Sequence, residues 1–233
     1  MKAVIDAHNI SRIYNPDTIP VYAVNNVHLH FLKGEFTAIV GPSGSGKTTL
    51  LNLIGGLDRS DTGHIFINDV DITKLSGQKL IHFRLYNIGF VFQAFNLIPV
   101  LTAKENVEFV MQLQGTPKAK REVRVKQLFT SVDLVDKMHS RPSELSGGQQ
   151  QRVAVARALA SKPQFVLADE PTANLDTKSA SNLLDIMTQL NREENMTFIF
   201  STHDQRVIER ARRVITLVDG RIDSDTALVS TAH

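Results

Sequence analysis

A glycine-rich loop between an expected strand and an expected helix constrains the fold of this chain most. The strand is the continuous apolar run Phe36–Val40, which is typical of a strand covered on both faces. Residues 41–48 follow it with the sequence GPSGSGKT, and apolar residues at helical spacing come next. The loop matches the pattern of a phosphate-binding loop, in which backbone N–H groups and a helix N-terminus face an anion. On its own the loop indicates a nucleotide, with kinases and GTPases still open.

The phosphate contacts are expected from the whole loop and from the start of the helix after it. They comprise Gly41, Ser43, Gly44, Ser45, Gly46, Lys47, Thr48 and Thr49. Lys47 is expected to reach the β- and γ-phosphates, and the Thr48 hydroxyl is expected to ligate Mg²⁺. The alternative, a glycine-rich turn that binds nothing, leaves the strand–loop–helix setting unexplained.

A second apolar strand ends in two carboxylates. Residues 165–168 are apolar, and Asp169 and Glu170 follow them directly. Neighbouring side chains of a strand point in different directions, so the two carboxylates can take different roles. Asp169 is expected to hold Mg²⁺ through water, and Glu170 to polarise the attacking water as a general base. A solvated turn is the alternative, and the phosphate-binding loop upstream argues against it.

Strand-like and helical segments alternate along the rest of the chain. Further strands are expected at residues 2–6, 27–32, 64–70, 88–92, 197–201 and 214–218, and helical segments at residues 97–160. Strands that alternate with helices predict an α/β core with a mostly parallel sheet. The block at about residues 97–160 interrupts that alternation, so we expect an inserted helical subdomain there.

Charge and composition narrow the classes of protein that fit. The chain has 26 Lys and Arg against 24 Asp and Glu, with the signs interspersed, which does not favour nucleic-acid binding. The absence of cysteine excludes disulfides and thiolate metal sites. The N-terminus lacks the apolar core of a signal peptide, and no segment approaches the ~20 apolar residues that span a bilayer. If the protein works at a membrane, another chain must supply the membrane-spanning part.

The segment Leu-Ser-Gly-Gly-Gln at residues 145–149 is rarer than the phosphate-binding loop, and it precedes the Asp169-Glu170 pair. Together these features resemble the nucleotide-binding subunit of ABC (ATP-binding cassette) ATPases. The resemblance implies a P-loop NTPase core with a mostly parallel sheet, an N-terminal antiparallel β subdomain and an inserted α-helical subdomain. It also implies one ABC ATPase domain over residues 1–223, followed by a short C-terminal tail at residues 224–233.

The resemblance assigns expected roles to three further residues. Gln93 resembles the glutamine that touches Mg²⁺ or the attacking water at a subdomain hinge, and an ordinary loop glutamine is the alternative. His203 follows an expected strand, whose carboxyl end faces the ligand crevice in a parallel α/β sheet. The resemblance makes it the switch histidine near the γ-phosphate. Tyr14 stands where the family stacks an aromatic ring on adenine, with a core tyrosine as the alternative.

The Leu-Ser-Gly-Gly-Gln segment also implies a second subunit. Ser146 and the amides of Gly147 and Gly148, followed by Gln149, form a second phosphate site at the start of a helix. In the ABC family this site completes the ATP site of the opposite subunit, so two chains close head to tail around two ATP molecules. Asp176 resembles a residue of the loop that crosses that interface. ATP and Mg²⁺ are therefore the expected ligands, in a homodimer or a pair of nucleotide-binding subunits.

Residues 88–107 resemble the bacterial branch of the family that serves lipoprotein release and macrolide-type export, and Asn174 agrees with that branch. Ala173 departs from it, because the branch has glycine there, and a methyl group would restrict the backbone if φ is positive. Five apolar residues follow Gln93: Phe95, Leu97, Ile98, Val100 and Leu101. We interpret some of them as a groove for a helix of a membrane partner, with a subdomain core as the alternative.

The expected function is ATP hydrolysis that powers export or extraction of lipoprotein, lipid or drug-type substrates through integral membrane permease subunits. We expect the chain at the cytoplasmic face of the inner membrane, peripheral through that partner and without nucleic acid. Three alternatives share the motifs: a mechanical regulator similar to the cell-division ABC system, an importer, and a soluble ABC ATPase of DNA repair or translation. A plain P-loop kinase would leave the Leu-Ser-Gly-Gly-Gln segment unexplained.

Two histidines stand apart from this pattern. His28 and His30 share one face of the expected strand at residues 27–32, at a spacing that metal ligands also use. The sequence shows no third ligand for them. A solvated strand face is therefore the expectation for both.

Overall fold

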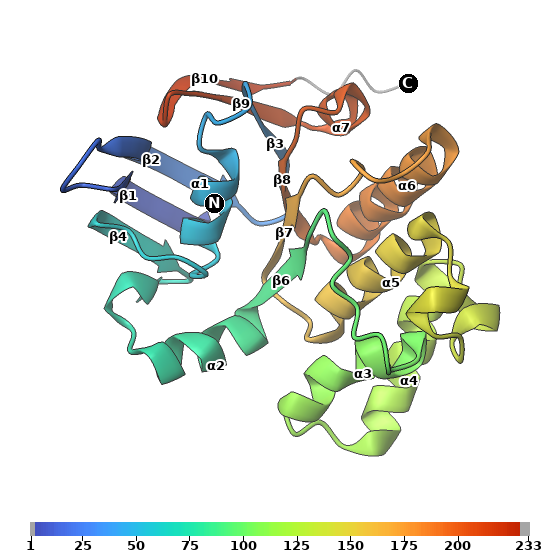
Figure 1. Cartoon of the computed structure of the whole chain (residues 1–233). Coiled ribbons are helices and arrows are strands. Elements are labelled where there is room, and N and C mark those ends of the chain that lie inside the picture. Colours follow the sequence, from blue (N-terminus) through green and yellow to red (C-terminus); the bar gives the residue numbers. More distant parts are fainter. Residues whose placement is uncertain (1–2, 229–233) are drawn as a thin grey trace.

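The computed structural model describes residues 3–228, which form two β-sheets with helices packed around them (Figure 1). The predicted α/β fold with a mostly parallel central sheet is confirmed. No helix within the described residues is long and apolar enough to cross a membrane.

The central sheet has the strand order β10-β9-β3-β8-β7-β6. Its strands are β3 (Phe36–Val40), β6 (Ile88–Val91), β7 (Phe165–Asp169), β8 (Thr197–Ser201), β9 (Arg213–Val218) and β10 (Arg221–Ala227). Neighbouring strands run parallel, except that β10 pairs antiparallel with β9 at one edge. The carboxyl ends of β3, β6, β7 and β8 therefore open on the same side, where ligands bind in sheets of this kind.

The second sheet is antiparallel and has the order β2-β1-β4-β5. Its strands are β1 (Ala3–Tyr14), β2 (Val21–Leu32), β4 (Thr62–Ile67) and β5 (Val70–Asp71). The prediction of one strand over residues 64–70 is wrong. Asn68 and Asp69 adopt positive φ angles of 46° and 68°, so the chain turns back between β4 and β5 as in a two-residue hairpin.

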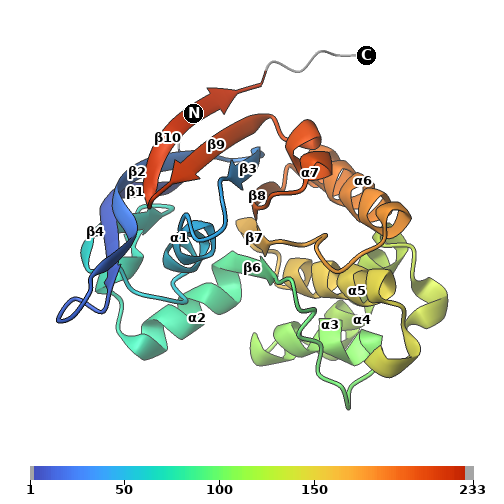
Figure 2. The same cartoon turned by 45° about the horizontal axis from the view of Figure 1, so that its top comes forward.

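Helix α1 (Lys47–Ile54) lies between the two sheets (Figures 1 and 2). Four of its apolar side chains are buried in the core shared with both sheets: Leu50, Leu51, Leu53 and Ile54. Burial of each such side chain contributes about 1.5–3 kcal/mol. This packing fixes the N-terminus of α1, and with it the loop that precedes the helix.

The other face of the central sheet carries a group of four helices. They are α3 (Ala103–Leu113), α4 (Lys118–Ser131), α5 (Gly147–Ala160) and α6 (Thr177–Glu194). Side chains of β7 alternate between the two cores, because Phe165 and Leu167 join the α1 side whereas Val166 and Ala168 join the helical side. This two-sided burial explains the continuous apolar runs at residues 165–168 of β7 and 198–200 of β8.

Two further helices and three short turns complete the fold of the described residues. They are α2 (Gly77–Asn87), α7 (Gln205–Arg210) and the 3₁₀ turns at Ile72–Lys74, Val135–Lys137 and Pro142–Glu144. Neither α2 nor β10 is among the elements expected from the sequence. Residues 224–227 of the expected tail belong to β10, and residues 229–233 lie outside the described residues. The proposed domain boundaries stay predictions.

Candidate functional site

The phosphate-binding loop has a backbone conformation that glycine adopts without strain. Gly41 and Gly46 have φ angles of 150° and 101°. A Cβ atom at Gly46 would lie 1.9 Å from the carbonyl oxygen of Ala23, and one at Gly41 would lie 2.0 Å from that of Leu217. The loop therefore packs directly against the backbones of β2 and β9, and a side chain at either glycine would displace it.

Lys47 and Ser45 present polar groups within the loop. The Lys47 Nζ donates to the carbonyl oxygens of Gly41 and Pro42, each at 2.9 Å. Ser45 is 3% exposed, and its hydroxyl has no hydrogen-bond partner among the described residues. A buried hydroxyl without a partner costs free energy, so an anion that accepts from it would be favoured. The loop thus fits a phosphate by an observation independent of its sequence pattern.

Thr48 and Asp169 meet where α1 begins and β7 ends. The Thr48 hydroxyl donates to Asp169 Oδ1 at 3.1 Å. A hydroxyl and a carboxylate are oxygen ligands of the kind that Mg²⁺ prefers, and Mg²⁺ is commonly held by one or two protein groups plus substrate phosphates. The two residues brought together here therefore fit a magnesium ion beside a bound nucleotide.

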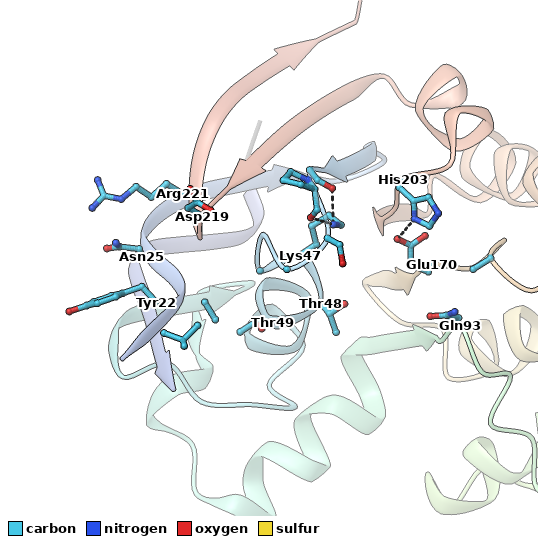
Figure 3. Close-up of a pocket in the computed structure, with 18 residues that line it drawn as sticks. Tyr22, Asn25, Lys47, Thr48, Thr49, Gln93, Glu170, His203, Asp219 and Arg221 are labelled. Carbon is cyan, nitrogen blue, oxygen red and sulfur yellow. Dashed lines mark hydrogen bonds and ion pairs between the residues drawn. The ribbon is translucent and has the colours of Figure 1, made fainter. Parts of the chain in front are cut away.

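Glu170 and His203 form a hydrogen-bonded pair next to the loop (Figure 3). The Glu170 Oε1 lies 2.8 Å from His203 Nδ1. Glu170 has a φ angle of 46°, and its N–H donates to the Ser201 carbonyl at 2.9 Å, so the end of β8 holds this unusual backbone in place. The side chain of Glu170 is 17% exposed and that of His203 is 75% exposed. The carboxylate of Glu170 is therefore mostly shielded from solvent, whereas the imidazole of His203 is exposed and can contact a ligand.

These groups border a cavity of about 1040 Å³. Of the eight residues predicted to contact phosphate in the loop and at the start of α1, all except Ser45 line the cavity. Gln93, Glu170 and His203 line it as well, and Figure 3 shows them on one side of Lys47. The site residues that do not line it are Tyr14, Ser45, Ser146, Gly147, Gly148, Gln149, Asp169 and Asp176.

Sequence reasoning missed the opposite wall of the cavity, which includes Asn25, Asp219 and Arg221 (Figure 3). Asp219 and Gly220 have positive φ angles of 46° and 73° and join β9 to β10 as a tight hairpin. The Gly220 N–H donates to the Ser45 carbonyl at 3.0 Å, so this hairpin supports the phosphate-binding loop. The Asp-Gly dipeptide is a hairpin signal that could have revealed the turn.

The Leu-Ser-Gly-Gly-Gln segment lies at the N-terminus of α5, in the helical part of the fold. Ser146 is the N-cap, and its hydroxyl accepts from the Gln149 N–H at 3.3 Å while the Gln149 side chain accepts from the Ser146 N–H at 2.9 Å. Both side chains thus cap the helix. None of these residues lines the cavity around Lys47, so the chain does not bring its two predicted phosphate sites together.

The connection between β7 and α6 ends at Asp176 and contacts the loop that contains Gln93. Asp176 caps α6 by accepting from the N–H groups of Lys178 and Ser179, both at 3.0 Å. Hydrogen bonds from Ser179 lower the pKa of Asp176 below its ordinary value. Asn174 donates to the Gln93 carbonyl at 3.1 Å, which links the two loops.

The departure at Ala173 carries no backbone strain. Ala173 is not among the described residues with positive φ. Its methyl group therefore does not strain the backbone of this loop. Ala173 instead lines the cavity.

Tyr14 lies beside the cavity without lining it. Its hydroxyl donates to Asp58 at 2.9 Å, and the Arg12 guanidinium lies 4.9 Å from the ring centre. Tyr14 pairs across the strands with Val21, which does line the cavity. The ring is 37% exposed, so it is not a core tyrosine. Its stacking on adenine stays a prediction.

The amino-acid sequence of this chain is similar to those of known proteins over most of its length. The family model for ABC transporters matches residues 24–173. The lipoprotein-releasing system ATP-binding protein LolD 1 of Rhodopseudomonas palustris is 46% identical over 95% of this chain and 99% of that protein. The macrolide export ATP-binding/permease protein MacB of Campylobacter jejuni is 45% identical over 87% of this chain, which spans only 32% of that protein.

Solved structures agree with the sequence relatives. The dimeric structure of a post-hydrolysis state of the ATP-binding cassette MJ0796, bound to ADP and Pi, has a TM-score of 0.89 to this chain at 39% identity. It covers 97% of this chain and 99% of that one. The protein MJ0796 of Methanocaldococcus jannaschii is itself described as an uncharacterised ABC transporter ATP-binding protein.

Proposed function

This chain belongs to the ABC transporter family and is an ATPase of that family, and on that premise we propose that it powers a lipoprotein-release or export complex. The single observation that carries the proposed two-subunit ATPase is the division of the site, and the likeness to LolD 1 supports the complex that it powers. Lys47, Thr48, Glu170 and His203 border one cavity, whereas Ser146 lies in another part of the fold. A complete ATP site therefore requires a second subunit.

Three oxygen donors of this chain would hold Mg²⁺: the Thr48 hydroxyl, the Asp169 carboxylate and the Gln93 amide. The contact between Thr48 and Asp169 supports the first two, and the position of Gln93 in the cavity lining supports the third. Held by these residues, Mg²⁺ would neutralise negative charge that develops on the phosphates.

Lys47 and the glycine-rich loop bind and orient the phosphates of ATP. Glu170 accepts the proton of the attacking water, and its fixed backbone holds the carboxylate at one position. His203 shares a hydrogen bond with Glu170 and contacts the γ-phosphate, so it aligns the base with the phosphate that is attacked. Tyr14 stacks on adenine from the rim of the cavity.

The second subunit contributes Ser146, Gly147, Gly148 and Gln149 to the phosphates, and Asp176 lies at the interface. Two copies related by a two-fold axis form two such sites, since an isologous interface repeats every contact. ATP holds the two copies closed, and hydrolysis releases them. The dimeric MJ0796 structures support this arrangement.

A membrane permease is the proposed partner that uses this closure. The likeness to LolD 1 supports lipoprotein release, and the likeness to MacB supports macrolide-type export. Leu97 packs against the helical core, whereas Val100 is 75% exposed. We assign the exposed part of residues 95–101 to contact with a helix of the permease, and the chain binds at the cytoplasmic face of the membrane through it.

The substitution Glu170→Gln tests the mechanism. It removes the base but keeps the shape, so we expect ATP binding to persist, turnover to fall by at least about 100-fold, and the protein to elute as a dimer in Mg-ATP. The matched control is Glu209→Gln, at an exposed residue of α7 outside the cavity, which should leave turnover unchanged. A monomeric Glu170→Gln protein at saturating Mg-ATP would contradict the mechanism.

The same variant tests the partner. Tagged Glu170→Gln protein held in Mg-ATP is captured from native membranes, and the bound proteins are identified by mass spectrometry. A permease with a large periplasmic domain is the expected result. Ribosomes, DNA or no membrane protein would reject the transporter complex while leaving the ATPase assignment intact.

A further inference from the structure

The outer face of the antiparallel sheet gathers histidines that the ATP site does not use. Along β1, Ile5 and Ala7 are fully buried against the core, which turns Asp6 and His8 to the opposite face. On β2, Leu29 is buried and His28 is exposed. Figure 1 shows β2, β1 and β4 side by side, with α1 on their inner side.

Strand register brings residues of β1 and β2 into one cluster. Ala7 pairs with Leu29 across the two strands, and this places His28 beside His8. The two imidazole rings lie 5.0 Å apart between their centres, and His8 Nε2 lies 3.0 Å from an Asp6 oxygen. One ligand atom each from Asp6, His8 and His28 lies within 4.8 Å of the others. The sequence alone pairs His28 with His30, but the partners of His28 in this cluster are Asp6 and His8 of the neighbouring strand, and His30 is not part of it.

We propose that Asp6, His8 and His28 bind a divalent transition-metal ion, Zn²⁺ being the best fit, with water completing the coordination. Two imidazoles and one carboxylate are the ligands that three-residue zinc sites use. Zinc bonds of 2.0–2.1 Å in a tetrahedron place ligand atoms about 3.3 Å apart. The Asp6–His8 pair already meets that spacing, and the exposed His28 closes the remainder by side-chain rotation.

The surroundings hold His8 and leave room for the water. The Phe66 ring lies 5.8 Å from the His8 ring, edge to face, which restricts the imidazole. A hollow of about 380 Å³ is lined by Asp6, His8 and Phe66. The nearby His64 is engaged elsewhere, since its Nδ1 lies 2.9 Å from Asp71. The ion would tie β1 to β2, and residues at the start of β2, Val21 to Ala23, line the nucleotide cavity.

Titration calorimetry with Zn²⁺ tests this site in the full chain, purified with chelator and free of nucleotide and Mg²⁺. We expect a site that His8→Ala and His28→Ala each weaken by at least about tenfold, because even outer-shell groups of a metal site are worth about 10- to 100-fold in affinity. Free Zn²⁺ at 100 times Kd should raise the melting temperature of the wild type by about 5–10 °C. Co²⁺ bound at the site should show the absorption of tetrahedral coordination.

The matched control is His139→Ala, an exposed histidine in the helical part of the chain, which should bind Zn²⁺ as the wild type does. Carboxylates near the nucleotide cavity are present in every variant, so any Zn²⁺ they bind cancels in the comparison. His28 is exposed, and its replacement keeps the test valid if His8→Ala fails to fold. Equal affinity in the wild type and the His28→Ala variant, or no binding by the wild type, would overturn the proposal and leave a solvated strand face.

Discussion

Asp204 joins the two loops that carry Glu170 and His203. Its carboxylate accepts from the Thr172 hydroxyl at 2.6 Å and from the Arg206 guanidinium at 2.7–3.1 Å. Thr172 follows Glu170 by two residues and is buried. The hydrogen bonds from Arg206, with those from Thr172, lower the pKa of Asp204 to about 2. The proton affinity of this one side chain therefore affects the stability of the folded site.

The substitution Asp204→Asn should destabilise the protein at neutral pH by about 2 kcal/mol, since one pKa unit corresponds to about 1.4 kcal/mol. The folded pKa is lower than the unfolded one, so the contribution of the carboxylate is present above about pH 4 and lost as pH falls towards 2. Urea unfolding across this range measures the difference. The exposed Asp17→Asn variant is the control, and an Asp204→Asn deficit that persists unchanged at pH 2 would reject this cause.

Residues close in the chain were predictable from the sequence, and residues joined by long-range packing were not. Lys47 and Thr48 follow from one pattern because the loop and helix are local structures. Asn25 and Arg221 reach the cavity only because β2 and the β9–β10 hairpin pack beside that loop. The left-handed backbone of Glu170 depends on a hydrogen bond to β8, which no pattern around residue 170 contains.

At the scale of elements, bulges explain why the predicted first strands are too short. Asn9 and Asn26 adopt positive φ angles of 51°, and the register of β1 against β2 shifts beside them. A bulge interrupts the two-residue alternation, so the pattern stops although the strand continues. The strands at residues 2–6 and 27–32 were therefore predicted as pieces of the 12-residue strands β1 and β2.

The contact between β6 and α5 depends on Gly89. A Cβ atom there would lie 2.7 Å from the Ala158 carbonyl oxygen, which belongs to the helix backbone. Gly89→Ala should therefore separate β6 from α5 and lower stability by about 1–3 kcal/mol, as overpacking does. Thermal unfolding measures this loss. Gly77→Ala is the matched control, since no atom lies within 4 Å of its added Cβ, and a similar loss in both variants would reject the packing argument.

At the scale of the whole molecule, the central sheet separates the two halves of the proposed ATP site. The phosphate-binding loop and α1 pack on one face, and α5 packs on the other (Figures 1 and 2). A short rearrangement within one chain would not bring Ser146 to Lys47 through a sheet whose strands are buried on both faces. Each chain is therefore expected to contribute a different half to each of two sites.

Mixing two inactive variants tests this division directly. Lys47→Ala removes the half formed by the phosphate-binding loop, and Ser146→Arg blocks the half formed by the Leu-Ser-Gly-Gly-Gln segment, so each protein alone should be inactive. A mixed dimer contains one site in which both halves are intact. Equal mixing makes half of the dimers mixed, and activity should return to about one quarter of the wild-type value if the two sites act independently. Unfolding curves of both variants exclude a folding defect, which matters because Ser146 also caps α5. No recovery from variants that fold and form mixed dimers would mean that each chain completes its own site or that one intact site does not support turnover.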